Sequence, residues 1–256
     1  MTRQEVRIRQ ALGEKWADIG VRALEETDST NLRLKEAARA GRISAPFLLT
    51  ADSQTAGRGR LNRQFLSPPG TGLYMSLFFR PPQDAESGRI TLLAAVAVCR
   101  AVEEESGLRL KIKWVNDLFL NGKKVCGILA ERIDEGVIVG IGVNILTPPG
   151  GFPPQAGPAG ALNAALDRDA LAGRIARCFL DGAQNLLDPA ILEEYRARMP
   201  LVGRQIFYTA PDGQERSALV TGVAEDGGLL ILDGREPKTL RTGEVTLGSQ
   251  AFEGLL

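Results

Sequence analysis

Three strand-like segments joined by tight turns constrain the fold of this chain more than any other feature of its sequence. Apolar and β-branched residues dominate LKIKW (110–114), KKVCGILAE (123–131) and GVIVGIGVNI (136–145). Asn121-Gly122 and Asp134-Glu135-Gly136 separate these segments, and such short, Gly-containing links are typical of turns between neighbouring strands. We therefore expect a cluster of adjacent strands at the centre of the chain.

Predicted helices and further strands flank this cluster, which places the chain in the α+β class. Asp28-Ser29-Thr30 is a capping pattern before an amphipathic helix that ends near Gly41. The other expected elements are strands at 47–53 and 71–79, helices at 90–107, 168–187 and 189–198, and a Pro- and Gly-rich loop at 147–160. After Met199-Pro200, short β segments broken by glycines predict a small SH3-like β-barrel. The expected domains are 1–200 and 201–256.

The composition is that of an ordinary globular protein and removes several functional classes. Apolar residues make up 44% and charged residues 24% of the chain, proportions that exclude a disordered protein. Basic and acidic side chains number 31 each, so no overall field favours nucleic acid or an anionic membrane. The start of the chain is too polar for a secretory signal, and no apolar run approaches the roughly 18 residues of a membrane span. We expect a cytoplasmic protein whose dispersed cysteines stay reduced.

The chain contains no histidine, which narrows its possible chemistry. Ser-His-Asp and Cys-His catalysts and the common zinc sites all depend on imidazole. Catalysis must therefore rest on lysine, arginine, aspartate, asparagine, backbone amides and, where needed, a hard metal ion.

An Arg- and Gly-rich segment follows the strand predicted at 47–53. Gly57-Arg58-Gly59-Arg60 and Arg63 place three like charges within six positions, and their repulsion costs stability. Guanidinium groups match phosphate and carboxylate oxygens, and the glycines allow the backbone to approach a ligand closely. The segment predicts a mobile anion-binding loop that closes over a nucleotide. The alternative is a solvated basic loop or a nucleic-acid patch.

A second group of polar residues stands where the strand predicted at 110–114 ends. Lys113-Trp114-Val115-Asn116-Asp117 brings an amine, a large aromatic ring, an amide and a carboxylate together within five residues. Strand alternation places Lys113, Val115 and Asp117 on one face, whereas a turn after Trp114 lets Asn116 and Asp117 project together. A hairpin returns Lys124 to the same place. The alternative is a surface-charged hairpin with Trp114 in the core.

Small residues alternate along the last strand of the central cluster, at Gly140-Ile141-Gly142-Val143-Asn144. This alternation indicates close approach of a ligand or another backbone, with Asn144 facing a cleft. A packed central strand is the simpler explanation for the same pattern. Neither a GxGxxG dinucleotide fingerprint opening a helix nor a GxxxxGK[ST] P-loop occurs in the chain.

In their order along the chain, these motifs strongly resemble the biotin–protein ligase family. The matching segments are Asp28-Ser29-Thr30-Asn31, Gln54 to Arg60, Ser67-Pro68, Leu73-Tyr74, Lys113 to Leu118, Lys124 with Gly127-Ile128-Leu129, and Gly140 to Asn144. They cover about residues 25–145, and Gly243-Glu244-Val245-Thr246 is similar to that family's C-terminal domain. The resemblance implies a mixed-sheet catalytic domain of the biotin/lipoate ligase type, followed by the SH3-like barrel.

The resemblance also implies an activity, which is adenylation of biotin by ATP with Mg²⁺ and transfer of biotin to a lysine of a carrier domain such as that of acetyl-CoA carboxylase. The implied catalytic residues are Arg58, Lys113, Asp117 and Lys124, with Asp117 also as the Mg²⁺ ligand. The implied biotin-binding residues are Ser29, Thr30, Asn31, Gln54, Arg58, Gly59, Arg60 and Lys124. The implied ATP-binding residues are Arg60, Arg63, Phe65, Asn116 and Asn144.

The sequence departs from the family pattern within the Arg-rich loop and beside it. The family's usual GRGRRGR-x-W has Asn62 here in place of a glycine and Phe65 in place of the tryptophan. Asparagine tolerates the left-handed region better than most residues, so we expect the loop to form with altered closure. Val115 replaces the commoner proline.

Two other functions fit part of the pattern. A lipoate–protein ligase shares the fold and the adenylate chemistry, but Lys113 to Asp117 and the Arg-rich loop follow the biotin pattern. A non-catalytic, biotin-responsive repressor carries a winged helix-turn-helix, and only about 25 residues precede Asp28. We expect a ligase without the DNA-binding half and without nucleic-acid or membrane partners. A homodimer formed through an exposed sheet edge is one expectation for its assembly.

Overall fold

The structure is a computed structural model that describes residues 1–60, 63–83, 85–210, 212–241 and 245–246. A seven-stranded mixed sheet forms its centre, with the strand order β1-β2-β3-β7-β6-β5-β4. β1 runs parallel to β2, and all other neighbouring strands are antiparallel. The strands are β1 (Gly20–Thr27), β2 (Phe47–Gln54), β3 (Gly72–Phe79), β4 (Lys111–Lys113), β5 (Asp117–Leu120), β6 (Lys123–Ile133) and β7 (Gly136–Asn144).

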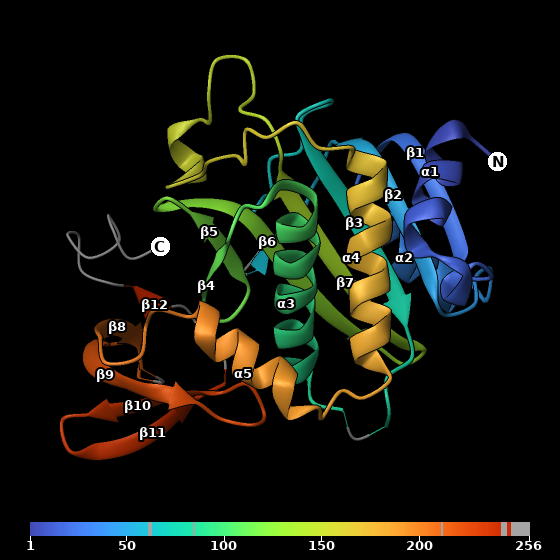
Figure 1. The fold of residues 1–256 in the computed structure, drawn as a ribbon. Coiled ribbons are helices and arrows are strands. Elements are labelled where there is room, and N and C mark those ends of the chain that lie inside the picture. Colours follow the sequence, from blue (N-terminus) through green and yellow to red (C-terminus); the bar gives the residue numbers. More distant parts are fainter. Residues whose placement is uncertain (61–62, 84, 211, 242–244, 247–256) are drawn as a thin grey trace.

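Helices cover both faces of this sheet. They are α1 (Arg3–Leu12), α2 (Thr30–Arg39), α3 (Ser87–Ser106), α4 (Arg168–Ala183) and α5 (Pro189–Arg198), with short 3-10 turns η1 (Glu14–Trp16) and η3 (Pro154–Ala156). α3 and α4 lie side by side across one face (Figure 1), whereas α2 packs on the other. Alternation along β2 explains this division, because Leu48 belongs to the main core cluster that includes α3 and α4, and its neighbour Leu49 packs with Leu34 of α2.

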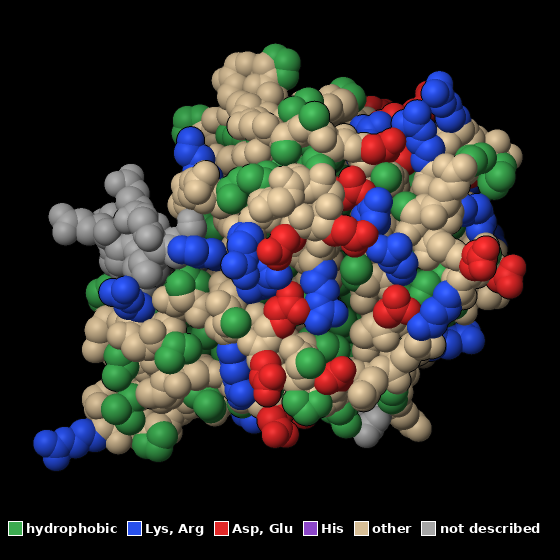
Figure 2. Space-filling view, in the orientation of Figure 1, with side chains coloured by type: hydrophobic (Ala, Val, Ile, Leu, Met, Phe, Trp, Pro, Cys, Tyr) green, Lys and Arg blue, Asp and Glu red, His purple; other side chains and the backbone are tan. Residues whose placement is uncertain are grey.

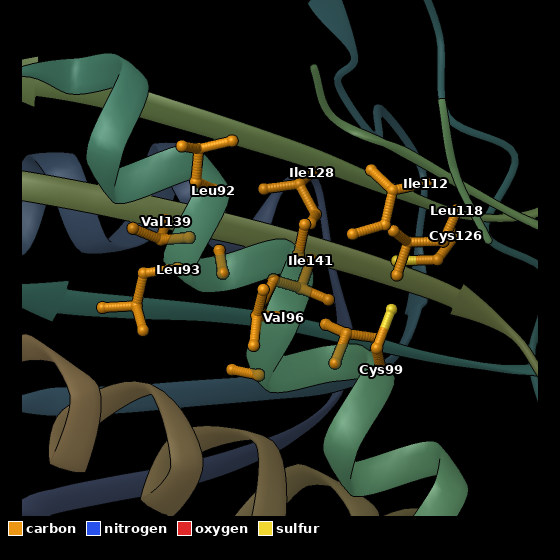
Figure 3. Packing of buried hydrophobic residues seen from close by; sticks show 14 of the residues in the cluster. Leu92, Leu93, Val96, Cys99, Ile112, Leu118, Cys126, Ile128, Val139 and Ile141 are labelled. Atoms are coloured by element: carbon orange, nitrogen blue, oxygen red, sulfur yellow. The ribbon is translucent and has the colours of Figure 1, made fainter. Parts of the chain in front are cut away.

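α3 forms the centre of the core because its middle part, residues 90–102, is almost entirely apolar and buried. Leu93 and Val96 pack among side chains of β6 and β7 that include Ile128 and Ile141 (Figure 3), and all of these side chains are at most 4% exposed. Truncation of one such leucine to alanine costs about 2–5 kcal/mol in comparable cores. The helix ends at Gly107, whose φ of 71° lies in the left-handed region that glycine adopts readily.

A second, antiparallel sheet follows α5, with the strand order β11-β10-β9-β8-β12. Its strands are β8 (Gln205–Thr209), β9 (Glu215–Val223), β10 (Leu229–Asp233), β11 (Glu236–Leu240) and β12 (Val245–Thr246). In the part of the chain that the structure describes, β11 and β12 are its outer strands. A small β unit of the predicted kind is therefore present, while its closure into a barrel stays a prediction, as does the domain division at residue 200.

The turn between β9 and β10 attaches this second sheet to the rest of the molecule. The indole Nε1 of Trp114 donates a hydrogen bond of 2.9 Å to Gly227 O, and Arg196 Nε donates one of 3.1 Å to Val223 O. α3 starts close to the same turn, since a Cβ placed on Gly88 would come within 2.2 Å of Asp226 O. The smaller sheet thus contacts both α3 and the polar segment after β4.

The N-terminal segment contains a helix, a 3-10 turn and a strand that we did not assign from the sequence. α1 begins with a capping box between Thr2 and Glu5 and packs on α4, and β1 is an edge strand of the large sheet. The sequence assignments were also wrong at two other places. The helix predicted to reach residue 187 ends at Ala183, because turns lead from there to the N-cap of α5 at Asp188. The short strand β5 had been left unassigned.

Basic and acidic side chains are mixed on the face of the molecule that carries α3, α4 and α5 (Figure 2). Ion pairs connect these helices, for example Arg100–Glu194 at 2.7 Å and Arg177–Glu104 at 3.2 Å. This mixing agrees with the equal numbers of basic and acidic residues. Among the described helices, none is long and apolar enough to cross a membrane.

Candidate active site

A cleft of about 660 Å³ opens over β3, β6 and β7, and it gathers every residue that we had assigned to catalysis or binding. These lining residues are Ser29, Thr30, Asn31, Gln54, Arg58, Gly59, Arg60, Arg63, Phe65, Lys113, Asn116, Asp117, Lys124 and Asn144. They come from separate segments of the sequence that the sheet brings together. Their common location supports one site, while the role of each residue stays a prediction.

The floor of the cleft depends on glycines of β6 and β7. A Cβ on Gly140 would lie 2.2 Å from Asn31 Oδ1, and a Cβ on Gly142 would lie 2.4 Å from Cε1 of Phe65. The Phe65 ring also lies near Gly127, where an added Cβ would be 3.2 Å from Cε2. The alternating glycines thus make room for two side chains that line the cleft, Asn31 and Phe65, which is a further explanation beside the ligand, backbone and packing alternatives.

A network of hydroxyl and amide groups joins the start of α2 to β2 and β3. Thr30 N and Oγ1 both donate to Gln54 Oε1, at 2.9 and 3.1 Å, and Gln54 Nε2 donates to Ser67 Oγ at 2.9 Å. Ser76 Oγ lies 2.7 Å from Thr30 Oγ1 and 2.5 Å from Asn31 Oδ1. Ser76 is fully buried and was missed in the sequence. Its signal was a single serine within the largely apolar strand GLYMSLFF.

The segment between β4 and β5 is a turn, and this places Asn116 and Asp117 together in the cleft. Simple strand alternation through residue 117 is therefore wrong, and the turn that we considered as the other possibility is present. The hairpin formed by β5 and β6 returns Lys124, whose Nζ lies 2.7 Å from Asp117 Oδ1. Trp114 is only 4% exposed, so this segment contributes both to the core and to the cleft.

The Arg-rich loop folds back on itself and reaches across to this turn. Gly59 N donates to Arg63 O at 2.7 Å, and Phe65 N donates to Gly57 O at 2.9 Å. The guanidinium of Arg60 donates a hydrogen bond of 2.9 Å to Asn116 Oδ1. The position of Asn62, where the sequence departs from the family pattern, lies outside the described residues, as do Gly243 and Glu244.

The Pro- and Gly-rich loop at 147–160 forms one wall of the cleft, which its sequence did not indicate. Lys124 N donates to Pro158 O at 2.8 Å, and Gly160 N donates to Lys124 O at 2.9 Å. The side-chain amide of Asn144 donates to Gly160 O at 2.9 Å. The loop therefore holds the backbone of Lys124 and the amide of Asn144 in place. Val245 and Thr246 of β12 also line the cleft.

The charges of the cleft suit a polyanionic ligand. Arg58, Arg60, Arg63, Lys113 and Lys124 line it, and among the described lining residues Asp117 is the one acidic side chain. Guanidinium and ammonium groups bind phosphate and carboxylate oxygens. In the described part of the chain, no group of three His, Cys, Asp or Glu residues is arranged to hold a metal ion.

The cysteines stand apart from this chemistry. Burial raises the pKa of Cys99 to about 12 and raises the pKa of Cys126 well above its usual value, so both thiols are protonated at neutral pH. Cys178 is partly buried, and burial raises its pKa as well. All three cysteines are free thiols.

The chain is similar in sequence to known proteins along nearly its whole length. Residues 23–146 match the family described as biotin/lipoate A/B protein ligase. Over 247 residues the chain is 30% identical to the biotin–[acetyl-CoA-carboxylase] ligase of Mycobacterium tuberculosis, an alignment that covers 91% of this chain and 90% of that protein. The chain is also 46% identical over 114 residues to the bifunctional ligase/repressor BirA of Bacillus subtilis. That match spans only 35% of the Bacillus protein's length.

The fold is similar to that of a solved protein of the same kind. The biotin protein ligase from Aquifex aeolicus, in complex with biotin and ATP, superposes on this chain with a TM-score of 0.75 and 29% sequence identity. The superposition covers 89% of this chain and 97% of the Aquifex protein. The similarity therefore extends beyond the sheet that carries the cleft.

Proposed function

This chain belongs to the biotin–protein ligase family, and on this premise we propose that it is an ATP-dependent biotin–protein ligase. It activates biotin as biotinyl-5'-AMP, releases pyrophosphate, and transfers the biotinyl group to a lysine of an acceptor protein. The observation that carries the proposal is the composition of the cleft. One set of lining residues offers hydroxyl and amide groups, and another offers cations, as an uncharged polar ring and an ATP triphosphate require.

Adenylation joins two anions, because the biotin carboxylate attacks the α-phosphate of ATP. Charge neutralisation and positioning are therefore the main tasks of the protein. Lys124, Arg58 and Arg60 line the same cleft and supply positive charge for the carboxylate and the phosphates. Ser29, Thr30, Asn31 and Gln54 hold the ureido ring in this proposal, Lys113, Arg63, Asn116 and Asn144 contact ATP, and the Phe65 ring packs against the nucleotide.

Magnesium ion suits the residues that are present. Mg²⁺ in nucleotide enzymes is commonly bound through one or two carboxylates and the substrate phosphates. Asp117 supplies one carboxylate in the cleft, and its ion pair with Lys124 at 2.7 Å places a cation and a potential metal ligand together. When bound, the ion would neutralise part of the triphosphate charge.

Transfer requires a neutral lysine amine to attack the carbonyl carbon of the mixed anhydride, with AMP as the leaving group. Asp117 is the described acidic group that lines the cleft, so we assign it to orient the incoming amine and accept its proton. The Arg-rich loop covers the anhydride and keeps water away from it. We propose a biotin carboxyl carrier domain as the acceptor, in line with the name of the Mycobacterium relative.

We further propose that the protein acts in the cytoplasm, where its free thiols stay reduced, and that its cleft cations serve ATP and not nucleic acid. The edge strands β1 and β4 of the large sheet offer backbone groups for a homodimer.

Incubation with ATP, Mg²⁺ and either biotin or lipoate, followed by mass spectrometry, tests the reaction directly. We expect biotinyl-5'-AMP and, with a purified biotin carboxyl carrier domain, a single biotinylated lysine. Formation of lipoyl-AMP in place of biotinyl-AMP would assign the chain to lipoate chemistry. Binding to DNA in a gel-shift assay, together with no biotinylation of the carrier domain, would favour a non-catalytic regulator.

A further inference from the structure

We infer that Glu131 of β6 is a positioning residue that fixes the side-chain amide of Asn31 and thereby sets the affinity of the cleft for biotin. The inference rests on the proposed function, because it concerns recognition of biotin at that site. Glu131 is not among the site residues that we predicted from the sequence, and its side chain does not line the cleft. It acts through Asn31, which does.

The amide of Asn31 is held in one orientation by partners on both of its ends. Its Nδ2 donates to Glu131 Oε2 at 2.9 Å and to Leu129 O at 3.3 Å. Its Oδ1 lies 2.5 Å from Ser76 Oγ, which donates a hydrogen bond to it. Asn31 is 4% exposed, so few other partners are available to it. A flipped amide would place Oδ1 against the Glu131 carboxylate, which cannot donate a hydrogen bond when ionised.

Glu131 is kept ionised by its surroundings. Burial alone raises the pKa of Glu131, but hydrogen bonds from Lys35 and Asn31 and the charges of Lys35 and Arg58 lower it, and the overall pKa lies below its usual value. Lys35 Nζ lies 2.6 Å from Glu131 Oε1, and the two side chains are only 16% and 22% exposed. At neutral pH the group facing Asn31 is therefore an obligatory acceptor.

This arrangement decides what the cleft presents to a ligand. Asn31 Oδ1 lies over Gly140, where an added Cβ would approach it to 2.2 Å. The single hydroxyl proton of Ser76 faces two acceptors, Asn31 Oδ1 and Thr30 Oγ1, while Thr30 uses its own proton on Gln54. Acceptors thus outnumber donors at this place. A ring with N–H groups, such as the ureido ring of biotin, satisfies the excess, and Glu131 keeps the Asn31 acceptor in position.

Steady-state kinetics of Glu131→Gln test the inference. The glutamine amide can offer an N–H toward Asn31, so the Asn31 amide loses its stronger fixed acceptor and keeps only the 3.3 Å hydrogen bond to Leu129 O. We expect the KM for biotin to rise about tenfold, as for loss of one buried hydrogen-bonding arrangement. The KM for ATP and kcat should stay within about twofold, because the ion pair of Glu131 is with Lys35, which does not line the cleft, and the cleft cation Arg58 acts on Glu131 only through its charge. A general loss of folded protein would instead lower kcat.

Glu36→Gln is the matched control. Glu36 is on α2 like Asn31, and its ion pair with Arg33 has side chains that are 47% and 50% exposed. The same substitution there removes a solvated charge pair, and we expect both KM values and kcat to stay unchanged. A rise in the KM for biotin in this control equal to that of Glu131→Gln would overturn the inference.

A second variant separates positioning from simple loss of charge. Asn31→Asp alone sets two carboxylates against each other and should bind biotin more weakly than Glu131→Gln does. Combining both substitutions exchanges donor and acceptor. The amide introduced by Glu131→Gln then donates to the carboxylate introduced by Asn31→Asp. The KM for biotin should therefore partly recover. Additive effects, or an unchanged KM in Glu131→Gln, overturn the inference alone. A wild-type protein that releases no pyrophosphate with biotin overturns the proposed function, and this inference with it.

Discussion

Lys124 is the side chain on which the proposed adenylation depends most, because it stands in the cleft beside the turn that carries Asp117. Lys124→Ala removes a cation that faces the developing charge and should reduce pyrophosphate release at least a hundredfold, comparable to losing one oxyanion donor at ~3 kcal/mol. The exposed neighbour Lys123 provides the matched control, and Lys123→Ala should leave the rate unchanged. A Lys124→Ala rate within threefold of wild type would contradict this role.

Arg58 differs from Lys124 because it is exposed on the Arg-rich loop while still lining the cleft. This position favours a role in retaining the intermediate over a role in forming it. Arg58→Ala should therefore still make biotinyl-5'-AMP but release it into solution, where it labels bystander amines. Non-specific biotinylation of added albumin measures this leak. Preserved adenylate formation without increased albumin labelling would show that the loop does not cover the intermediate.

Individual site residues were predictable from the sequence where polar motifs stand next to apolar strand segments and occur in the order typical of a known family. The Arg-rich loop and Lys113 to Asp117 were found in this way, and the structure places them in one cleft. Ser76 was missed because the rest of its strand is largely apolar, and Glu131 was missed because it resembles an ordinary charged residue near the end of β6; only the folded sheet shows their partners. Hydrogen bonds between distant segments leave no local signal in a sequence.

Along β7, two glycines separate what we expect to be the biotin and nucleotide parts of the cleft. Gly140 makes room for Asn31, and Gly142 makes room for Phe65. A methyl group at either position overpacks the floor at a cost of about 1–3 kcal/mol. We expect Gly140→Ala to raise the KM for biotin about tenfold and Gly142→Ala to raise the KM for ATP by a similar factor, by the same overpacking argument.

The two variants serve as controls for each other, because they make the same substitution on the same face of one strand. Steady-state kinetics with each substrate varied in turn measure the two KM values. If both variants raise the same KM, the cleft is not divided along β7 in this way. Phe65 would then have to be reassigned from the nucleotide to the biotin part.

Elements were predictable where a long pattern determines them. α3 and β7 were found because continuous burial requires continuous apolar sequence, as seen in Val96 and Ile141. β1 was missed because its hydrogen bonds come from one neighbour, β2, and most of its side chains are partly exposed. β5 was missed because a four-residue strand between two turns has too few positions to show alternation.

At the scale of the whole molecule, the sequence predicted two β units but not how they meet. The α+β class and a smaller β unit after residue 200 followed from the change in pattern at Met199-Pro200. The order of strands in the large sheet did not follow, because non-neighbouring segments such as β3 and β7 pair across long connections. Buried residues of the smaller sheet, such as Val220 and Ile231, belong to the same core cluster as α3, and the turn between β9 and β10 adds the hydrogen bond from Trp114.

Hydrogen bonds hold the segment before β5 at three successive positions, and the contact with the smaller sheet supplies one of them. Trp114 donates to Gly227 O in the smaller sheet, Val115 O accepts from Tyr195 of α5 at 3.2 Å, and Asn116 O accepts from Ile128 N of β6 at 3.0 Å. The turn that places Asn116 and Asp117 in the cleft is therefore fixed by three different elements. A change at the contact between the sheets should be felt at the site.

Trp114→Phe tests this connection because it keeps an aromatic ring while removing the indole N–H. Gly227 O then loses its donor at a buried contact, and we expect the free energy of unfolding to fall by about 1–3 kcal/mol.

Trp16→Phe is the matched control. The Trp16 indole donates to Asp181 Oδ1 at an exposed place, so loss of this hydrogen bond should lower the free energy of unfolding by less than about 0.5 kcal/mol. The chain has two tryptophans, so each variant retains one fluorescent reporter for urea unfolding. Transfer of biotin should also slow in Trp114→Phe, because the turn at 114–116 is held less firmly and Asp117, the next residue, is then less well positioned in the cleft. Equal stability losses in the two variants, with unchanged transfer, would mean that the smaller sheet does not support the site.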